Sequence, residues 1–180
     1  MKIAFISKEN PLNRRAWSGT IYSIFSCLKK IQGYKVLGLG PLADFYRVKE
    51  IFKRKYFKFF YNSKFDSNRT IKLSKYYSKQ IDKNLKSKKF NFIFTIDPKL
   101  VNYIKSKIPL IIWADATFKS YFNTYFKNQK IHKETIKQGK IIEKKSFLNS
   151  KFVFFSSQWA LNSAVNTYPG LKNKFRIVKY

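Results

Sequence analysis

Six short runs of apolar residues divide the chain, and each is six or seven residues long. They are rich in β-branched and aromatic side chains, and they are mostly continuous rather than alternating with polar residues. The runs cover residues 2–7, 35–40, 90–96, 109–114, 151–156 and 175–180. Continuous apolar runs of this length are typical of strands buried on both faces, as in a parallel sheet. The pattern therefore predicts six parallel strands with helices covering both faces of the sheet.

Stretches with helical periodicity separate these runs. The first opens at Ser18-Gly19-Thr20 and closes at Gly33, and residues 130–148 are helical by composition although their apolar stripe is looser. Shorter helices fit residues 100–104, begun by Asp97-Pro98, and the segment around Ala164. The three clear apolar stripes consist of Ile21, Ile24, Phe25, Leu28 and Ile31; of Phe45, Val48, Phe52, Tyr56 and Phe59; and of Leu73, Tyr77, Ile81 and Leu85.

The alternation of strands and helices predicts an α/β fold. Right-handed βαβ units build a Rossmann-like, doubly wound parallel sheet, and ligands bind such sheets beyond the carboxyl ends of the strands. A chain of 180 residues suffices for one well-buried core but is short for two domains of ordinary size. We therefore expect a single domain over residues 1–180.

The charge of the chain is strongly one-sided. Lys and Arg number 38 against 9 Asp and Glu, which gives a formal net charge of +29. Such an excess favours polyanionic partners, namely nucleic acid or an anionic membrane surface. A general bias toward Lys, Asn, Ile, Phe and Tyr explains the same charge without any partner, and the sequence leaves both explanations open.

Basic residues are concentrated in the stretch 45–60, around the aromatic stripe that begins at Phe45. They are Arg47, Lys49, Lys53, Arg54, Lys55 and Lys58. A basic amphipathic helix with aromatic anchors is typical of proteins that bind a membrane surface. The alternative is a helix whose stripe covers the sheet and whose lysines are simply solvated.

The lengths of the apolar runs and the numbers of cysteines and histidines bear on the location of the protein and on metal binding. Met1-Lys2 leads into an apolar stretch much shorter than that of a signal peptide, and no run reaches the length of a membrane span. The single Cys27 cannot form an internal disulfide, and we expect it to be packed within its helix. We therefore expect a cytoplasmic protein, with peripheral attachment to the inner face of the membrane as the alternative. With one histidine, His132, read as an exposed helix residue, we expect no metal site.

Candidate site residues follow the predicted strands. Ser18, Gly19 and Thr20 follow the first strand, where a glycine and the free N–H groups of a helix would suit a diphosphate. Asp115 follows the fourth strand, where a carboxylate would accept a hydrogen bond from a substrate hydroxyl. Ser157 follows the fifth strand and also reads as a helix cap. Capping is likewise the alternative for Asp115, and it is the better interpretation of Asp97.

Three segments in register with this βαβ pattern resemble family 4 glycosyltransferases. MKIAFIS…WSGTIYSIFSCLKKIQGYKVLGLGP resembles the opening of that family, and IPLIIWADATFKSYFNTYF resembles a P-x-x-x-x-x-D-A-T-F stretch of one of its branches. EKKSFLNSKFVFFSSQWALNSAVNTYPGLKNKFRIVKY resembles the close of its N-terminal domain. The resemblance covers nearly the whole chain in order and weakens between Ala43 and Lys89.

The resemblance implies the N-terminal, acceptor-side half of a two-domain GT-B enzyme. Such enzymes transfer a sugar from a nucleotide-sugar to a glycan or lipid-linked acceptor with retention, without a cofactor and usually without a metal. The residues that match are Ser18, Gly19 and Thr20, facing the donor phosphate and sugar, and Asp115, near the acceptor. Ser157 falls in the matching SSxWA segment. The nucleotide-binding half would lie beyond Tyr180, so we expect the isolated chain to be inactive.

The main rival is a non-enzymatic basic α/β domain that binds nucleic acid or another polyanion. The net charge and the twelve tyrosines favour it. However, most aromatic residues fall at periodic, core-facing positions rather than on one strand face, and no RNP-like, KH or zinc-finger pattern is present. We therefore do not expect nucleic acid to be the partner.

Overall fold

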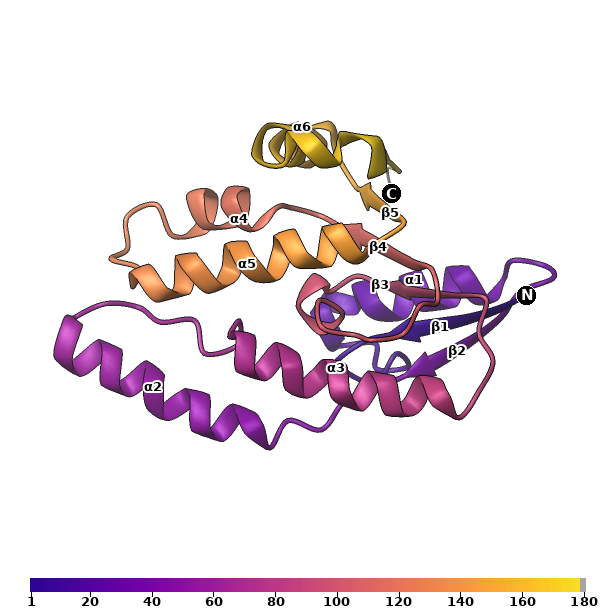
Figure 1. Ribbon diagram of the computed structural model, residues 1–180, viewed down its shortest axis with the longest axis horizontal. Coiled ribbons are helices and arrows are strands. Elements are labelled where there is room, and N and C mark those ends of the chain that lie inside the picture. The colour runs from indigo at the N-terminus through magenta and orange to yellow at the C-terminus, as the bar shows by residue number, and fades with distance from the viewer. Residues whose placement is uncertain (179–180) are drawn as a thin grey trace.

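The computed structural model describes residues 1–178, except for the side chain of Arg47. It contains a six-stranded, all-parallel sheet with the order β2-β1-β3-β4-β5-β6 (Figure 1). The strands are β1 (Lys2–Ile6), β2 (Lys35–Leu39), β3 (Phe92–Thr95), β4 (Leu110–Ala114), β5 (Phe152–Phe155) and β6 (Phe175–Ile177). Each strand falls within one predicted apolar run, although residues 179–180 of the last run lie outside the described residues. The predicted α/β, doubly wound fold is confirmed.

Six α-helices and three short 3₁₀ helices connect and follow the strands within the described residues. They are α1 (Thr20–Lys29), α2 (Tyr46–Tyr61), α3 (Ile71–Lys86), α4 (Phe118–Tyr125), α5 (Lys133–Asn149), α6 (Gln158–Thr167), η1 (Ala16–Gly19), η2 (Pro98–Leu100) and η3 (Pro169–Lys174). The sequence did not predict α4. The helix expected at residues 100–104 is instead η2, which Asp97 caps by accepting a hydrogen bond from the Lys99 N–H.

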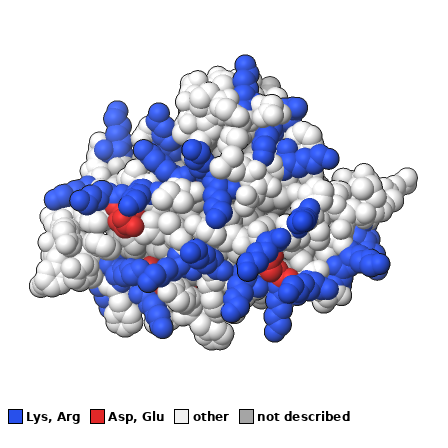
Figure 2. Space-filling view, in the orientation of Figure 1, with Lys and Arg blue, Asp and Glu red and all other residues white. Residues whose placement is uncertain are grey.

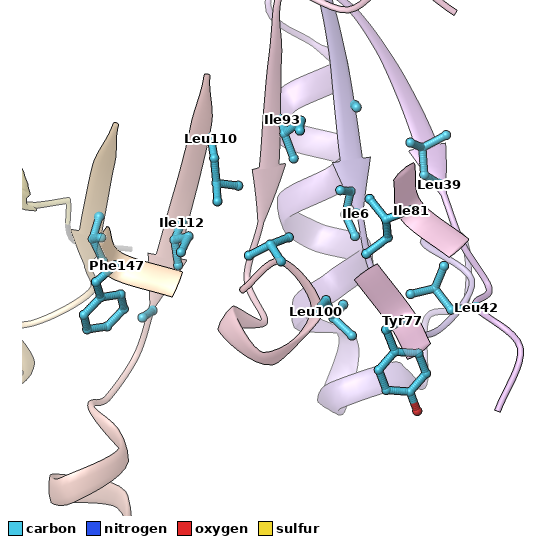
Figure 3. Close-up of a cluster of buried hydrophobic side chains, with 14 of the residues drawn as sticks. Ile6, Leu39, Leu42, Tyr77, Ile81, Ile93, Leu100, Leu110, Ile112 and Phe147 are labelled. Carbon is cyan, nitrogen blue, oxygen red and sulfur yellow. The ribbon is translucent and has the colours of Figure 1, made fainter. Parts of the chain in front are cut away.

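Two apolar clusters hold the helices to the sheet. On one face, the predicted stripe of α3 is buried throughout and packs with Ile6, Ile93 and Ile112 of the strands and Phe147 of α5 (Figure 3). On the other face, α1 packs Ile21 and Phe25 against β1 and its neighbours. The crossovers determine this division: only the β1–β2 connection runs toward the β2 edge, so a right-handed crossover places α1 opposite the other helices.

The sheet face that packs against α1 is covered unevenly. Beside β1, the side chains of Ile3 and Phe5 are fully buried. Toward β5, Ile111, Phe152 and Phe154 remain partly exposed. Helices thus flank both faces of the sheet, as predicted, but the cover on the α1 side is incomplete toward β5.

Helix α2 lies at the outside of the molecule, and its aromatic stripe does not cover the sheet. Phe45, Phe52 and Phe59 are 83%, 67% and 83% exposed. Among the described side chains of α2, the buried one is Glu50, which forms an ion pair with Lys53 at 3.2 Å. The alternative in which this stripe packs on the sheet is therefore wrong. No helix in the described part of the chain is long and apolar enough to cross a membrane.

Two isoleucines from predicted stripes provide a test of this packing. Ile81 of α3 is fully buried, whereas Ile31 lies beyond the end of α1 and is 46% exposed. We expect Ile81→Ala to lower the free energy of unfolding by about 2–5 kcal/mol, because it leaves a cavity. Ile31→Ala should change it by less than about 0.5 kcal/mol. Urea denaturation of both variants measures this, and equal losses would contradict the described end of α1.

Candidate functional site

A pocket of about 470 Å³ lies beyond the carboxyl ends of β3 and β4. Ile96 and Ala114 lie at these strand ends, and the loop of residues 64–69 between α2 and α3 forms one side. Aromatic side chains from α4 and its C-terminal end, and the first half of α5, form the other side. In Figure 1, α2, α4 and the first half of α5 extend past the ends of the strands. The volume is within the range of small-molecule sites.

Asp115 lies exposed at the edge of this pocket. It does not cap α4. That role belongs to Thr117, which forms a reciprocal capping box with Ser120 and is itself buried. No hydrogen bond or ion pair of the Asp115 carboxylate is found among residues 1–178. The capping alternative for Asp115 is therefore wrong, and its carboxylate is free to accept a hydrogen bond from a ligand.

The loop before α1 reaches the pocket through Trp17 rather than through Ser18, Gly19 or Thr20, which are not among the lining residues. Three successive residues have positive φ: Trp17 (49°), Ser18 (53°) and Gly19 (86°). Gly19 is the N-cap of α1 and forms no side-chain cap, and a Cβ there would lie 3.3 Å from the carbonyl oxygen of Arg14. Left-handed backbone at non-glycine residues costs free energy and is concentrated at functional sites. The binding role of the three predicted residues stays a prediction.

A buried carboxylate forms the inner wall of the pocket. Glu143 of α5 accepts hydrogen bonds from the Phe118 N–H and, at 2.8 Å, from the Tyr168 hydroxyl. Burial raises the pKa of Glu143 to about 7, although both donors and the charge of Arg69 oppose the shift. Burial also raises the pKa of Tyr168, with a further contribution from Glu143. Glu143 therefore exchanges its proton near neutral pH, unlike an ordinary carboxylate.

Both basic and acidic side chains line the same pocket. The guanidinium of Arg69 lies 5.0 Å from the ring centre of Phe118 and 5.4 Å from that of Tyr121, and it is 3.9 Å from Asp66. Lys99 and Asp97 form an ion pair at 2.9 Å. A flat guanidinium held against aromatic rings is a fixed donor for hydroxyl or phosphate oxygens. The pocket thus offers both hydrogen-bond donors and acceptors to a ligand.

The other residues singled out in the sequence are not among those that line this pocket. Ser157 caps α6, since its hydroxyl accepts from the Ala160 N–H at 3.2 Å, and it is not among the lining residues. His132 is not an exposed helix residue but the N-cap of α5, with its ring 4.0 Å from that of Phe57. Cys27 is exposed rather than packed. No group of three potential metal ligands comes together in the described part of the chain.

Sequence reasoning missed Arg69, Gly139 and Glu143. Arg69 lies between Ala43 and Lys89, where the resemblance to known sequences is weakest. The inward face of α5 carries Thr135, Gly139 and Glu143 at four-residue spacing, which explains why its apolar stripe looked loose. A scarce acidic residue on the inward face of a helix was the available signal for Glu143.

Comparisons with known proteins found no family model and no curated protein that matches this chain. A function for this chain therefore has to be inferred from the pocket, from its residues and from the motifs described above.

Replacing Glu143 tests its perturbed ionisation. Because its pKa is about 7 in the folded chain and near 4.5 when unfolded, the folded state binds this proton more tightly, and its contribution to stability is lost as pH rises from about 4.5 to 7. We expect Glu143→Gln to remove that loss, which amounts to about 3 kcal/mol. Urea denaturation of both proteins at several pH values measures it. Parallel stability profiles would show that Glu143 titrates normally.

Replacing Gly139 tests the contact between α4 and α5. A Cβ at Gly139 would lie 2.1 Å from the ring of Phe118, which also packs on Phe122. We expect Gly139→Ala to lower the free energy of unfolding by about 1–3 kcal/mol, although alanine favours a helix by about 1 kcal/mol. Adding Phe118→Leu should recover part of the loss. A stabilised Gly139→Ala protein would contradict the described packing.

Proposed function

We propose that this domain is the acceptor-side half of a glycosyltransferase that uses a nucleotide-sugar and acts with retention. The observation that carries the proposal is the free carboxylate of Asp115 at the edge of the pocket, directly after β4. Asp115 belongs to the segment that resembles the D-A-T-F stretch of family 4 enzymes, and the strand-end location is the usual ligand site in such sheets. The acceptor would be a glycan or a glycolipid of the cell envelope.

The chemistry assigned to the pocket residues is orientation of the acceptor. Asp115 would accept a hydrogen bond from the hydroxyl that receives the sugar, while Arg69 would donate to a neighbouring oxygen. The partly exposed side chain of Tyr121 would contact the sugar, whereas the buried ring of Phe118 supports Arg69. The strained loop at Ser18 and Gly19, next to the N-terminus of α1, would face the departing nucleoside diphosphate, whose increasing negative charge needs fixed donors. No metal or cofactor is part of this proposal.

A polyanion-binding domain without enzymatic activity is the second candidate, supported by the net charge of +29. It does not require a free carboxylate in the pocket, since an acid there would repel a polyanion. The two proposals therefore differ in what removal of the Asp115 charge should do.

We expect Asp115→Asn to lower kcat/KM for sugar transfer by about 100-fold or more, the range of a lost acid–base or orienting group. The assay uses the longest protein that the gene encodes, with isotope-labelled nucleotide-sugars and extracted glycolipid acceptors. The free energy of unfolding should stay within about 0.5 kcal/mol of the parent value, because Asp115 is exposed.

Asp82→Asn is the matched control. Asp82 of α3 accepts from the Lys105 and Ser106 N–H groups and is not among the residues that line the pocket. It should leave transfer unchanged. Equal activity of the Asp115→Asn protein and the parent would refute the acceptor role, and tighter polyanion binding without any transfer would favour the second candidate.

A further inference from the structure

A second cavity lies beside the pocket, between the C-terminal half of α2 and the segments around Ser63 and Lys130. Its volume is about 830 Å³. Five cationic side chains line it, and no acidic one does; the cations are Arg54, Lys55, Lys58, Lys64 and Lys130. In the first pocket, by contrast, Asp66, Asp97, Asp115 and Glu143 accompany the cations. We refer to this second cavity as the cationic groove.

The hydrogen-bond partners of Lys58 and Lys64 in the groove are neutral side chains. Lys58 donates to the side-chain oxygen of Asn62 at 3.2 Å, and Lys64 donates to that of Gln129 at 3.1 Å. Five positive charges around one cavity repel each other, so an anion that enters it gains more than at an isolated surface lysine. The charge of the groove is therefore suited to an anionic ligand.

Ser63 supplies an independent indication of a ligand. It lines the groove, is only 3% exposed, and its hydroxyl has no hydrogen-bond partner among the described residues. A buried hydroxyl without a partner costs free energy. An oxygen of a bound phosphate would complete its hydrogen bonding, as it would that of the surrounding lysines.

The groove adjoins the exposed aromatic stripe of α2. Phe59 belongs to both, and Phe45, Phe52 and Tyr56 continue the stripe along the helix. Figure 2 shows uncharged surface at the end and lower edge where Figure 1 places α2, and basic side chains scattered across the rest of the visible face. Free phosphate or nucleic acid would use the lysines but would not require a row of exposed phenylalanines. Aromatic side chains beside basic ones are suited to the interface of an anionic bilayer.

We propose that α2 docks on an anionic lipid bilayer and that the cationic groove holds the phosphate of a lipid headgroup. The phenylalanines of the stripe enter the interface, and the groove receives the phosphate at the membrane surface. The groove and the pocket share Arg54, Lys64 and Phe65, so a lipid-linked acceptor held by its phosphate would have its sugar directed toward Asp115. Lipid binding itself does not depend on the proposed transferase activity.

Vesicle sedimentation with the chain of residues 1–180 tests the proposal without any sugar transfer. We expect binding to phosphatidylcholine vesicles that contain phosphatidylglycerol or phosphatidic acid, no binding to phosphatidylcholine alone, and weaker binding as salt is raised. Removing two groove charges with Lys55→Gln and Lys58→Gln should lower the affinity by about tenfold or more. Lys29→Gln with Lys30→Gln, which removes the same charge at the end of α1, is the matched control and should have a smaller effect.

The aromatic variants separate a bilayer from other anions. Phe52→Ser with Phe59→Ser should weaken vesicle binding by about tenfold. Trp159→Ser, at another exposed aromatic residue, on α6, should leave it unchanged. Ser63→Ala should weaken binding to phosphatidic acid more than the control does. Circular dichroism verifies that each variant is folded.

Three results would overturn the proposal. Unchanged vesicle binding of the folded aromatic variant would mean that charge alone holds the protein to lipid. Equal losses from the groove and α1 lysine pairs would mean that the groove is not a site. Tighter binding of a single-stranded oligonucleotide, or of inorganic phosphate in competition with vesicles, that is insensitive to Phe52 and Phe59 would assign the groove to a soluble anion.

Discussion

The all-parallel pairing of the strands is the constraint on which the remaining structure depends. It brings every strand's carboxyl end to one edge of the sheet, so the residues that follow β1, β3 and β4 gather there although they lie far apart in sequence. The right-handed crossovers then place α3, α5 and α6 on one face and α1 on the other. Because α2, α4 and the start of α5 extend past this edge, they enclose the pocket that contains Asp115.

The strands and α3 could be predicted because burial determines them directly. Ile3 to Ile6 and the stripe from Leu73 to Leu85 are buried in the structure as their patterns require. Helix α4 was missed although its aromatic residues recur at helical spacing, because it is only eight residues long; Phe118 packs on Phe122 and Tyr121 on Tyr125, each four residues apart. For α2 the periodicity was correct, but a stripe that packs on a sheet and one that is exposed have the same sequence pattern.

The candidate site was only partly predictable. The position of Asp115 after a buried strand follows from the sequence, whereas its freedom from capping depends on the Thr117–Ser120 pair, which competes for the same helix end. Ser157 was equally plausible by position, yet its hydroxyl is used by α6. Glu143 and Arg69 reach the pocket through contacts between segments that are distant in sequence. A local signal existed for Glu143 alone, as a scarce acid on the inward face of α5.

Ligand binding at the carboxyl edge of the sheet can be measured by hydrogen–deuterium exchange. The ligands are hexose and disaccharide acceptors, with and without a phosphate group. If ligands bind in the pocket, exchange should become slower in residues 64–69, in α4 and in the first half of α5, which surround it. No change is expected at the opposite edge, where Gly33, Tyr34 and Asn91 line a separate cavity. Slower exchange confined to that opposite edge would contradict ligand binding at the carboxyl edge of the sheet.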